Sequence, residues 1–186
     1  MTFEVELKFA VHDPGHFSRM VQSLGGKWGQ PMFQVDRYFN HPSRDFVRTD
    51  EAFRIRSVSD RNYVTYKGPK VDTTTKTRQE IELPLASGGA AADTFRHMLE
   101  ALGFRFVAAV HKQRKSANVH WTQQNVEIVL DNVDEVGVYA ELEITCEQAD
   151  VESAQQVLVS LAKRLELKTT EHRSYLELLL QSQAGR

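Results

Sequence analysis

Residues 3–9 read FEVELKF, so that Glu4, Glu6 and Lys8 alternate with large apolar side chains. Successive side chains of a β-strand point to opposite faces of a sheet, so this segment places its charges on one face and its apolar groups on the other. A single strand of this kind is typical of a sheet with one face in water. The same pattern returns along the chain, and the repetition requires an explanation.

Pairs of charges two residues apart recur in several later segments, some of them acidic and others basic. In an open sheet these charges would face water, where cross-strand ion pairs contribute little stability. In a sheet that curls shut they would face one another. The lining of such an interior would consist of Glu4, Glu6, Glu80, Glu82, Asp131, Glu141 and Glu143 together with Lys8, Arg54, Arg56, Lys67, Arg78, Lys112 and Arg114.

Composition places the chain among globular proteins without a disulfide framework. Its 186 residues are 41% hydrophobic, carry a formal net charge of −2 and include one cysteine, Cys146. The length suits a single domain, which we expect over residues 1–186. No apolar run approaches the roughly 20 residues of a membrane span. We therefore expect a cytoplasmic protein that has no membrane or nucleic-acid partner.

Periodicity predicts strands and helices mixed along the chain, with mostly antiparallel strands because the connections are short. Helices are expected after Asp13, over 95–102, after Asp150, and from Ser174, where Glu177 has capping-box spacing. Segment 68–76 lacks periodicity and is expected to be a mobile loop. After the first strand, further strands are expected at 33–40, 52–58, 62–67, 77–84, 105–115, 117–121, 125–131 and 138–145.

A closed interior lined in this way would need occupants, because buried unpaired charge is costly. Clustered carboxylates suit hard divalent cations such as Mg²⁺ or Mn²⁺, which take oxygen ligands. Clustered arginines and lysines suit phosphate oxygens. A metal-bound polyphosphate satisfies both sets at once.

Several motifs give the chain a family resemblance. Glu4-Val5-Glu6-Leu7-Lys8 matches the ExExK signature of the CYTH superfamily, the triphosphate tunnel metalloenzymes. The chain most resembles class IV adenylyl cyclase-like members of that superfamily. The other motifs that carry the resemblance are DRYF at 36–39, FRIR at 53–56, TYKGPK at 65–70, TRQEIEL at 77–83, KQR at 112–114, LDNV at 130–133, AELEI at 140–144 and SYLELL at 174–179.

The resemblance implies an α+β fold in which a closed eight-stranded antiparallel barrel forms a triphosphate tunnel and the helices pack on its outside. It implies catalytic roles for Glu4, Glu6 and Lys8, with Tyr38 as a candidate for proton transfer. The implied metal ligands are Glu4, Glu6, Asp131, Glu141 and Glu143, with Glu80 and Glu82 at a second metal. The implied triphosphate ligands are Lys8, Arg54, Arg56, Lys67, Arg78, Lys112 and Arg114.

Two reactions fit such a tunnel. Attack of the substrate's own 3′-hydroxyl on the α-phosphorus of ATP would give cyclic AMP and pyrophosphate, the reaction of an adenylyl cyclase. Attack of water would make the protein an inorganic tripolyphosphatase or a thiamine or nucleoside triphosphatase. The third hypothesis is a module that binds nucleotide or polyphosphate without turnover. In each case the partner is a small triphosphate (ATP, tripolyphosphate or thiamine triphosphate), and a homodimer is left open.

Overall fold

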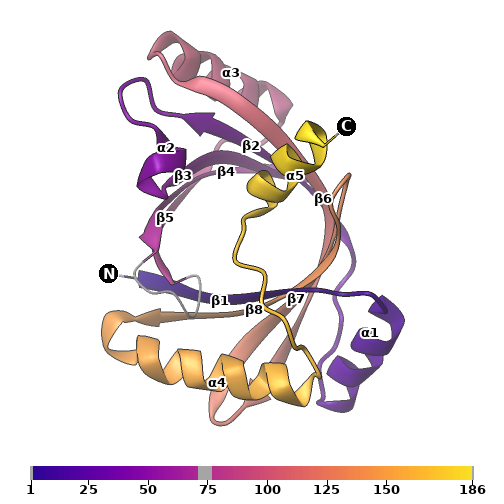
Figure 1. Ribbon diagram of the computed structural model, residues 1–186. Coiled ribbons are helices and arrows are strands. Elements are labelled where there is room, and N and C mark those ends of the chain that lie inside the picture. Colours follow the sequence, from indigo (N-terminus) through magenta and orange to yellow (C-terminus); the bar gives the residue numbers. More distant parts are fainter. Residues whose placement is uncertain (1, 71–76, 186) are drawn as a thin grey trace.

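The strands close into an antiparallel barrel. The structure, a computed structural model, describes residues 2–70 and 77–185, and these contain eight strands in the circular order β1-β5-β4-β3-β2-β6-β7-β8. Figure 1 shows the ring of strands end on. The closed eight-stranded fold that the family resemblance implies is therefore confirmed. The strand bounds are β1 (Thr2–Ala10), β2 (Met32–Asn40), β3 (Ala52–Val58), β4 (Arg61–Lys70), β5 (Arg78–Leu85), β6 (Arg105–Trp121), β7 (Gln124–Val133) and β8 (Gly137–Glu147).

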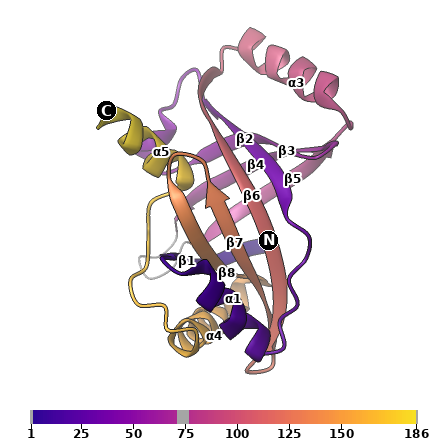
Figure 2. The same cartoon turned by 90° about the vertical axis from the view of Figure 1, so that its right-hand side faces the viewer.

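Helices lie on opposite sides of the ring. In Figure 1, α3 covers the side formed by β2 and β3, whereas α4 lies under β1 and β8 and α1 lies beside it. Figure 2 shows the long strand β6 running between these two helical layers. The helices of the described residues are α1 (Pro14–Ser23), α2 (Phe46–Thr49), α3 (Gly89–Ala101), α4 (Val151–Arg164) and α5 (Tyr175–Ala184), with a 3-10 turn (Gln148–Asp150) before α4.

The largest hydrophobic core lies outside the barrel, between the strands and helices α1 and α4. Alternation in β1 turns Val5 and Leu7 outward, where they join Val21 of α1 and Leu158 and Leu161 of α4 in one buried cluster. A second cluster forms where α3 packs on β2 and β3. Because the apolar faces point outward to the helices, the charged faces point inward.

Helix α5 differs from the other helices in its position. Its residues Leu178 and Leu179 belong to a buried cluster with Tyr38 of β2 and Val110 of β6. The segment before α5 runs beside β1, because Phe9 bridges Thr170 and the backbone N–H of Glu171 donates to the carbonyl of Lys8 at 2.7 Å. The C-terminal segment therefore closes part of one end of the barrel.

The predicted helix starts at Asp13 and Ser174 are confirmed. The Asp13 carboxylate accepts the backbone N–H of His16 at 2.8 Å, before Pro14 begins α1. At α5, Ser174 Oγ accepts the backbone N–H of Glu177 at 3.1 Å, and Glu177 accepts the backbone N–H of Ser174 at 2.6 Å. Asp150 directly precedes α4, but its side chain makes no capping hydrogen bond.

Several element boundaries differ from the sequence predictions. Strands 105–115 and 117–121 are one strand, β6, because Ser116 stays in register with Val129 of β7. The predicted loop 68–76 begins too early, since β4 continues through Lys70. The rest of that loop, 71–76, lies outside the described residues.

The short helix α2 was not predicted, because side-chain capping rather than an apolar stripe forms it. Asn40 Oδ1 accepts the backbone N–H of Phe46 at 2.9 Å, and Asp45 Oδ1 accepts that of Val47 at 3.2 Å. Across the described residues, none of the helices combines the length and the apolar character required to pass through a bilayer.

Substitution in the hydrophobic core between the barrel and helices α1 and α4 tests how much this core stabilises the fold. We expect Leu158→Ala to lower the free energy of unfolding by about 2–5 kcal/mol, since Leu158 is fully buried between α4 and the strands and its removal leaves a cavity. Urea denaturation measures the change. Leu102→Ala is the control, because Leu102 is 63% exposed and its truncation is expected to cost little. Equal losses in the two variants would contradict this placement of the core.

Candidate active site

Charged side chains are buried inside the barrel, so the charged strand faces meet one another and not bulk water. Lys8, Asp36 and Asp131 are each no more than 1% exposed, and Glu141 is 5% exposed. Charges buried to this degree are stable only when they are paired or bind ions. The interior combines ion pairs with a cluster of carboxylates that could hold an ion.

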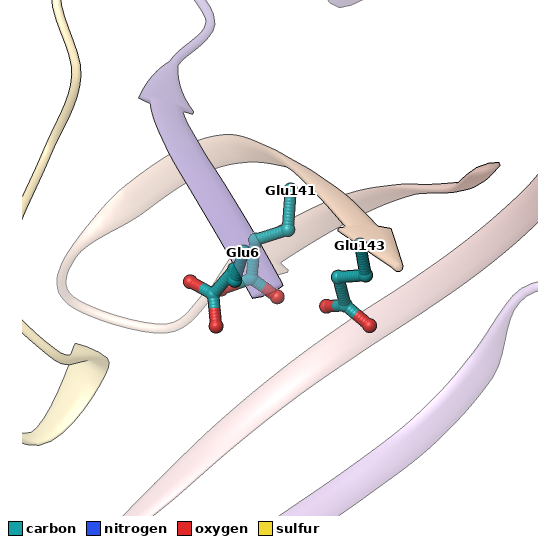
Figure 3. Close-up of side chains that lie close together, drawn as sticks. All are labelled: Glu6, Glu141 and Glu143. Atoms are coloured by element: carbon teal, nitrogen blue, oxygen red, sulfur yellow. The ribbon is translucent and has the colours of Figure 1, made fainter. Parts of the chain in front are cut away.

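Three carboxylates converge where β1 meets β8. The side chains of Glu6, Glu141 and Glu143 each offer an oxygen, and these oxygens all lie within 4.8 Å of one another. The strand register explains the cluster, because Glu6 lies opposite Glu143 in the antiparallel pair. Figure 3 shows the three side chains extending from the two strands toward the same side.

The charge of this cluster disfavours its own ionisation. Burial raises the pKa of Glu143 well above its usual range, and the neighbouring carboxylates Glu4, Glu141 and Glu6 raise it further, although Arg114 acts in the opposite direction. A divalent cation would remove the repulsion and prefers oxygen ligands of this kind. The donor set therefore fits Mg²⁺ or Mn²⁺.

Asp131 is surrounded by cations. The Arg114 guanidinium holds it with two hydrogen bonds of 2.8 and 2.5 Å, and Lys112 Nζ donates to it at 3.0 Å. Arg114 also contacts Glu141 and lies 3.7 Å from Glu143. Desolvation lowers the pKa of Lys112 to about 8, and the Arg114 charge contributes to the decrease. Asp131 thus orients two predicted phosphate ligands next to the carboxylate cluster.

A second ion-pair group contains Asp36, which the sequence analysis did not include among the site residues. Arg56 binds Asp36 through two hydrogen bonds of 2.7 and 2.8 Å, and Arg54 Nη1 donates to it at 3.3 Å. Burial would raise the pKa of Asp36, but the charges of the two arginines hold it well below its usual range. Arg54 also lies 3.4 Å from the hydroxyl of Tyr38.

A third group is centred on Lys67 of β4. Its ammonium contacts Glu4 of β1 and lies 2.8 Å from Glu80 of β5. Burial alone would lower the pKa of Lys67, but the two carboxylates raise it above its usual range. Glu82 is not part of this group, since it is exposed and accepts a hydrogen bond from Thr65 Oγ1 at 2.9 Å.

Two predicted phosphate ligands interact with residues outside these groups. The Arg78 guanidinium donates to the carboxylate of Asp50, which follows α2, at 3.0 Å. Lys8 donates to the backbone carbonyl of Arg173 in the segment before α5. Asp50 and Arg173 were not identified from the sequence, because both contacts depend on segments that meet only in the folded barrel.

One pocket opens at the end of the barrel near α2 and α5. Its lining includes Glu6 of the carboxylate cluster, Arg54 of the Asp36 group and Lys67 of the third group. At its mouth, the exposed lining residues mix apolar side chains, including Val47 and Leu180, with polar ones, including His172 and Glu177. The pocket therefore joins charged groups of the interior to a mouth that is partly apolar.

Comparison with known proteins identifies the family. The CYTH domain model matches residues 2–175, and the chain belongs to the CYTH family. A protein of Methanocaldococcus jannaschii named "Putative adenylate cyclase MJ0240" is 34% identical over 94% of this chain and 97% of its own length. Adenylate cyclase CyaB of Aeromonas hydrophila is 29% identical over 97% of this chain and 90% of its own length.

Solved structures share the whole fold. The PH1819 protein of Pyrococcus horikoshii superposes with a TM-score of 0.83 at 35% identity, covering 96% of this chain and 98% of its own. The protein HpAC1 from Hippeastrum superposes with a TM-score of 0.63 at 13% identity, covering 97% and 96% of the two chains. HpAC1 is described as having a dominant triphosphatase activity, and at this identity the likeness concerns the fold alone.

Neutralising Glu143 tests the electrostatics of the cluster. Because the folded protein retains the Glu143 proton to higher pH than the unfolded chain does, stability falls as the pH rises above about 4.5 towards the raised folded-state pKa. Glu143→Gln removes that loss. We expect the metal-free variant to melt above the wild type, by a margin that grows as the pH rises above about 5, as calorimetry can measure.

The same variant is expected to lose the stabilisation that Mg²⁺ gives the wild type, since it lacks one of the three ligands. Glu152→Gln on the exposed face of α4 is the control: it should keep the Mg²⁺ stabilisation and should not melt above the wild type, since Glu152 is an acid in the first turn of a helix. A Glu143→Gln variant that melts below the wild type throughout this pH range would contradict the assignment.

Proposed function

We propose that this chain is a divalent-metal-dependent enzyme that acts on triphosphates inside the barrel, converting ATP to cyclic AMP and pyrophosphate. The observation that carries the proposal is the placement of the three-carboxylate cluster beside buried arginines and lysines within one closed barrel. Full-length similarity to proteins named as adenylate cyclases supports the choice of reaction.

The cationic side chains would bind the triphosphate. A guanidinium has five N–H groups, so Arg56 and Arg114 retain donors for phosphate oxygens while Asp36 and Asp131 fix their orientation. Arg54, Lys8, Lys67 and Lys112 add charge along the same interior, and Arg78 would contact the ligand near the mouth. Such fixed positive charge stabilises the negative charge that develops at the reacting phosphorus.

Glu6, Glu141 and Glu143 would hold the metal ion. When bound, this ion supplies Lewis-acid polarisation of the phosphate oxygens. Glu4 and Glu80 lie beside Lys67 and would orient it. Glu4, Glu80 and Asp131 would be further metal ligands, because they lie next to the three-carboxylate cluster. Glu82 shares the strand face of Glu80 and accepts a hydrogen bond from Thr65, which lines the pocket, so it would be available as a ligand of a second metal. Tyr38 lies next to Arg54 and would position it or assist proton transfer.

The mouth of the pocket favours an organic triphosphate over inorganic tripolyphosphate. An inorganic chain has no apolar part, whereas the mouth places apolar groups of α2 and α5, including Val47 and Leu180, next to the charged interior. A planar base would bury apolar surface there. This favours a nucleotide as the substrate.

Hydrolysis is the alternative outcome of the same binding mode, because only the nucleophile and the attacked phosphorus differ. The triphosphatase activity described for HpAC1 concerns a protein of this fold, so the products and not the fold decide between the reactions. Binding without turnover is less consistent with the site, since clustered carboxylates repel a phosphate chain unless a metal is present.

Product analysis tests the proposal. With ATP and Mg²⁺ or Mn²⁺, phosphorus NMR is expected to show pyrophosphate and cyclic AMP. Glu6→Gln should reduce the rate by at least about 100-fold while the fold is retained, because it removes a metal ligand. Orthophosphate without cyclic AMP would show that the protein is a hydrolase and not a cyclase. Absence of any product with either metal would contradict the proposal that the protein is an enzyme.

A substitution at the mouth tests the substrate class. Val47 is 80% exposed and lines the opening, so Val47→Ser would lose about 1 kcal/mol of contact with a base, or roughly fivefold in KM for ATP. Binding of inorganic tripolyphosphate should not change. Leu83→Ser is the control, since Leu83 is 58% exposed and does not line the pocket. Equal weakening of both ligands would contradict a base-binding mouth.

A further inference from the structure

Tyr175 is the first residue of α5, and its position is fixed by several contacts. The capping box of Ser174 and Glu177 sets the start of the helix, and the Tyr175 ring packs edge-to-face on Tyr139 with ring centroids 5.6 Å apart. The side chain is 6% exposed and shares a cluster with the inward-facing residues of the barrel. A helix that follows the last strand thus places an aromatic side chain at the charged interior.

The hydroxyl of Tyr175 is buried and has no hydrogen-bond partner among residues 2–70 and 77–185. The charges that act on it belong to Glu141, Asp131, Arg114 and Glu6, all residues of the candidate active site. Buried polar groups in native proteins are nearly always hydrogen-bonded, so an unpaired one indicates a missing partner. A phenylalanine would fill the same space without this cost.

The Tyr175 ring also lies beside two of the predicted phosphate ligands. Lys8 Nζ is 4.2 Å from the ring centroid, and Lys112 Nζ is 5.0 Å from it. Both ammonium groups thus interact with the same aromatic side chain. A phosphate oxygen that these lysines bind would therefore lie near the Tyr175 side chain.

We propose that the Tyr175 hydroxyl donates a hydrogen bond to a nonbridging oxygen of the bound triphosphate, which makes α5 part of the substrate-binding site. This inference rests on the proposed function, because it requires a triphosphate in the barrel. It assigns the unpaired hydroxyl a partner whose charge is complementary to the neighbouring lysines. It also explains why the C-terminal segment contacts the barrel interior and not only its outer surface.

Tyr175→Phe tests the proposal, because it keeps the ring and removes only the hydroxyl. Titration calorimetry of the full chain with inorganic tripolyphosphate and Mg²⁺ should give a Kd about tenfold weaker than that of the wild type. The melting temperature of the ligand-free variant should be unchanged or higher, because an unpaired buried hydroxyl has been removed. A purely structural hydroxyl would not produce this pair of effects.

Tyr139→Phe is the matched control. Tyr139 packs against the same ring, but the charges that act on its hydroxyl are Glu171 and Arg173 of the preceding segment, not the carboxylate cluster. Its tripolyphosphate Kd should equal that of the wild type.

The outcomes separate this inference from the proposed function. If the wild type does not bind tripolyphosphate, the proposed function fails and the inference fails with it. If the wild type binds and Tyr175→Phe binds equally well, the inference alone is overturned. A ligand-free Tyr175→Phe variant that melts several degrees below the wild type also overturns it, because the hydroxyl would then have a partner within the protein.

Discussion

Burial of ionised side chains inside a closed sheet is the constraint on which the rest of the structure depends. The alternation that begins in β1 places apolar side chains on the outer face, so the hydrophobic core forms between the barrel and helices α1, α3 and α4. The charged faces then have no access to bulk water except at the barrel ends. Each buried cation must find a carboxylate, a carbonyl or a ligand, and this requirement organises the interior.

The charges of the interior are not all balanced in the same way. Asp36 and Asp131 each bind two cations and hold them in fixed orientations. Glu6, Glu141 and Glu143, in contrast, crowd together, and burial followed by the charge of neighbouring carboxylates raises the pKa of Glu143. Oriented cations beside crowded carboxylates are preorganised for a phosphate chain that carries a metal ion.

Where charges come in pairs, strand alternation predicted which of them share a face of a strand. Glu141 and Glu143 share a face by strand alternation, and their approach to Glu6 follows once β1 pairs with β8. Asp36 was missed because it is a single acid next to Arg37, without a like charge two residues away. Its pairing with Arg56 depends on the β2–β3 register, which sequence periodicity does not specify.

The other differences arise from local side-chain hydrogen bonds or from contacts between segments that lie far apart in the sequence. Helix α2 depends on side-chain hydrogen bonds of Asn40 and Asp45, which leave no periodic pattern in four residues. The capping box predicted the start of α5, but it does not place the helix at the barrel end, since that position depends on the contacts of Lys8 and Glu171. Glu80 and Glu82 are identical in pattern, yet only Glu80 pairs with Lys67.

The central claim is that the barrel interior binds a metal ion and a phosphate chain together, and anomalous diffraction from crystals grown with Mn²⁺ and tripolyphosphate tests it most directly. The account predicts a manganese peak about 2.0–2.3 Å from oxygens of Glu6, Glu141 and Glu143, with phosphate density that contacts both the ion and the guanidinium of Arg114. An interior without manganese or phosphate, with the metal bound only at the outer surface, would contradict it.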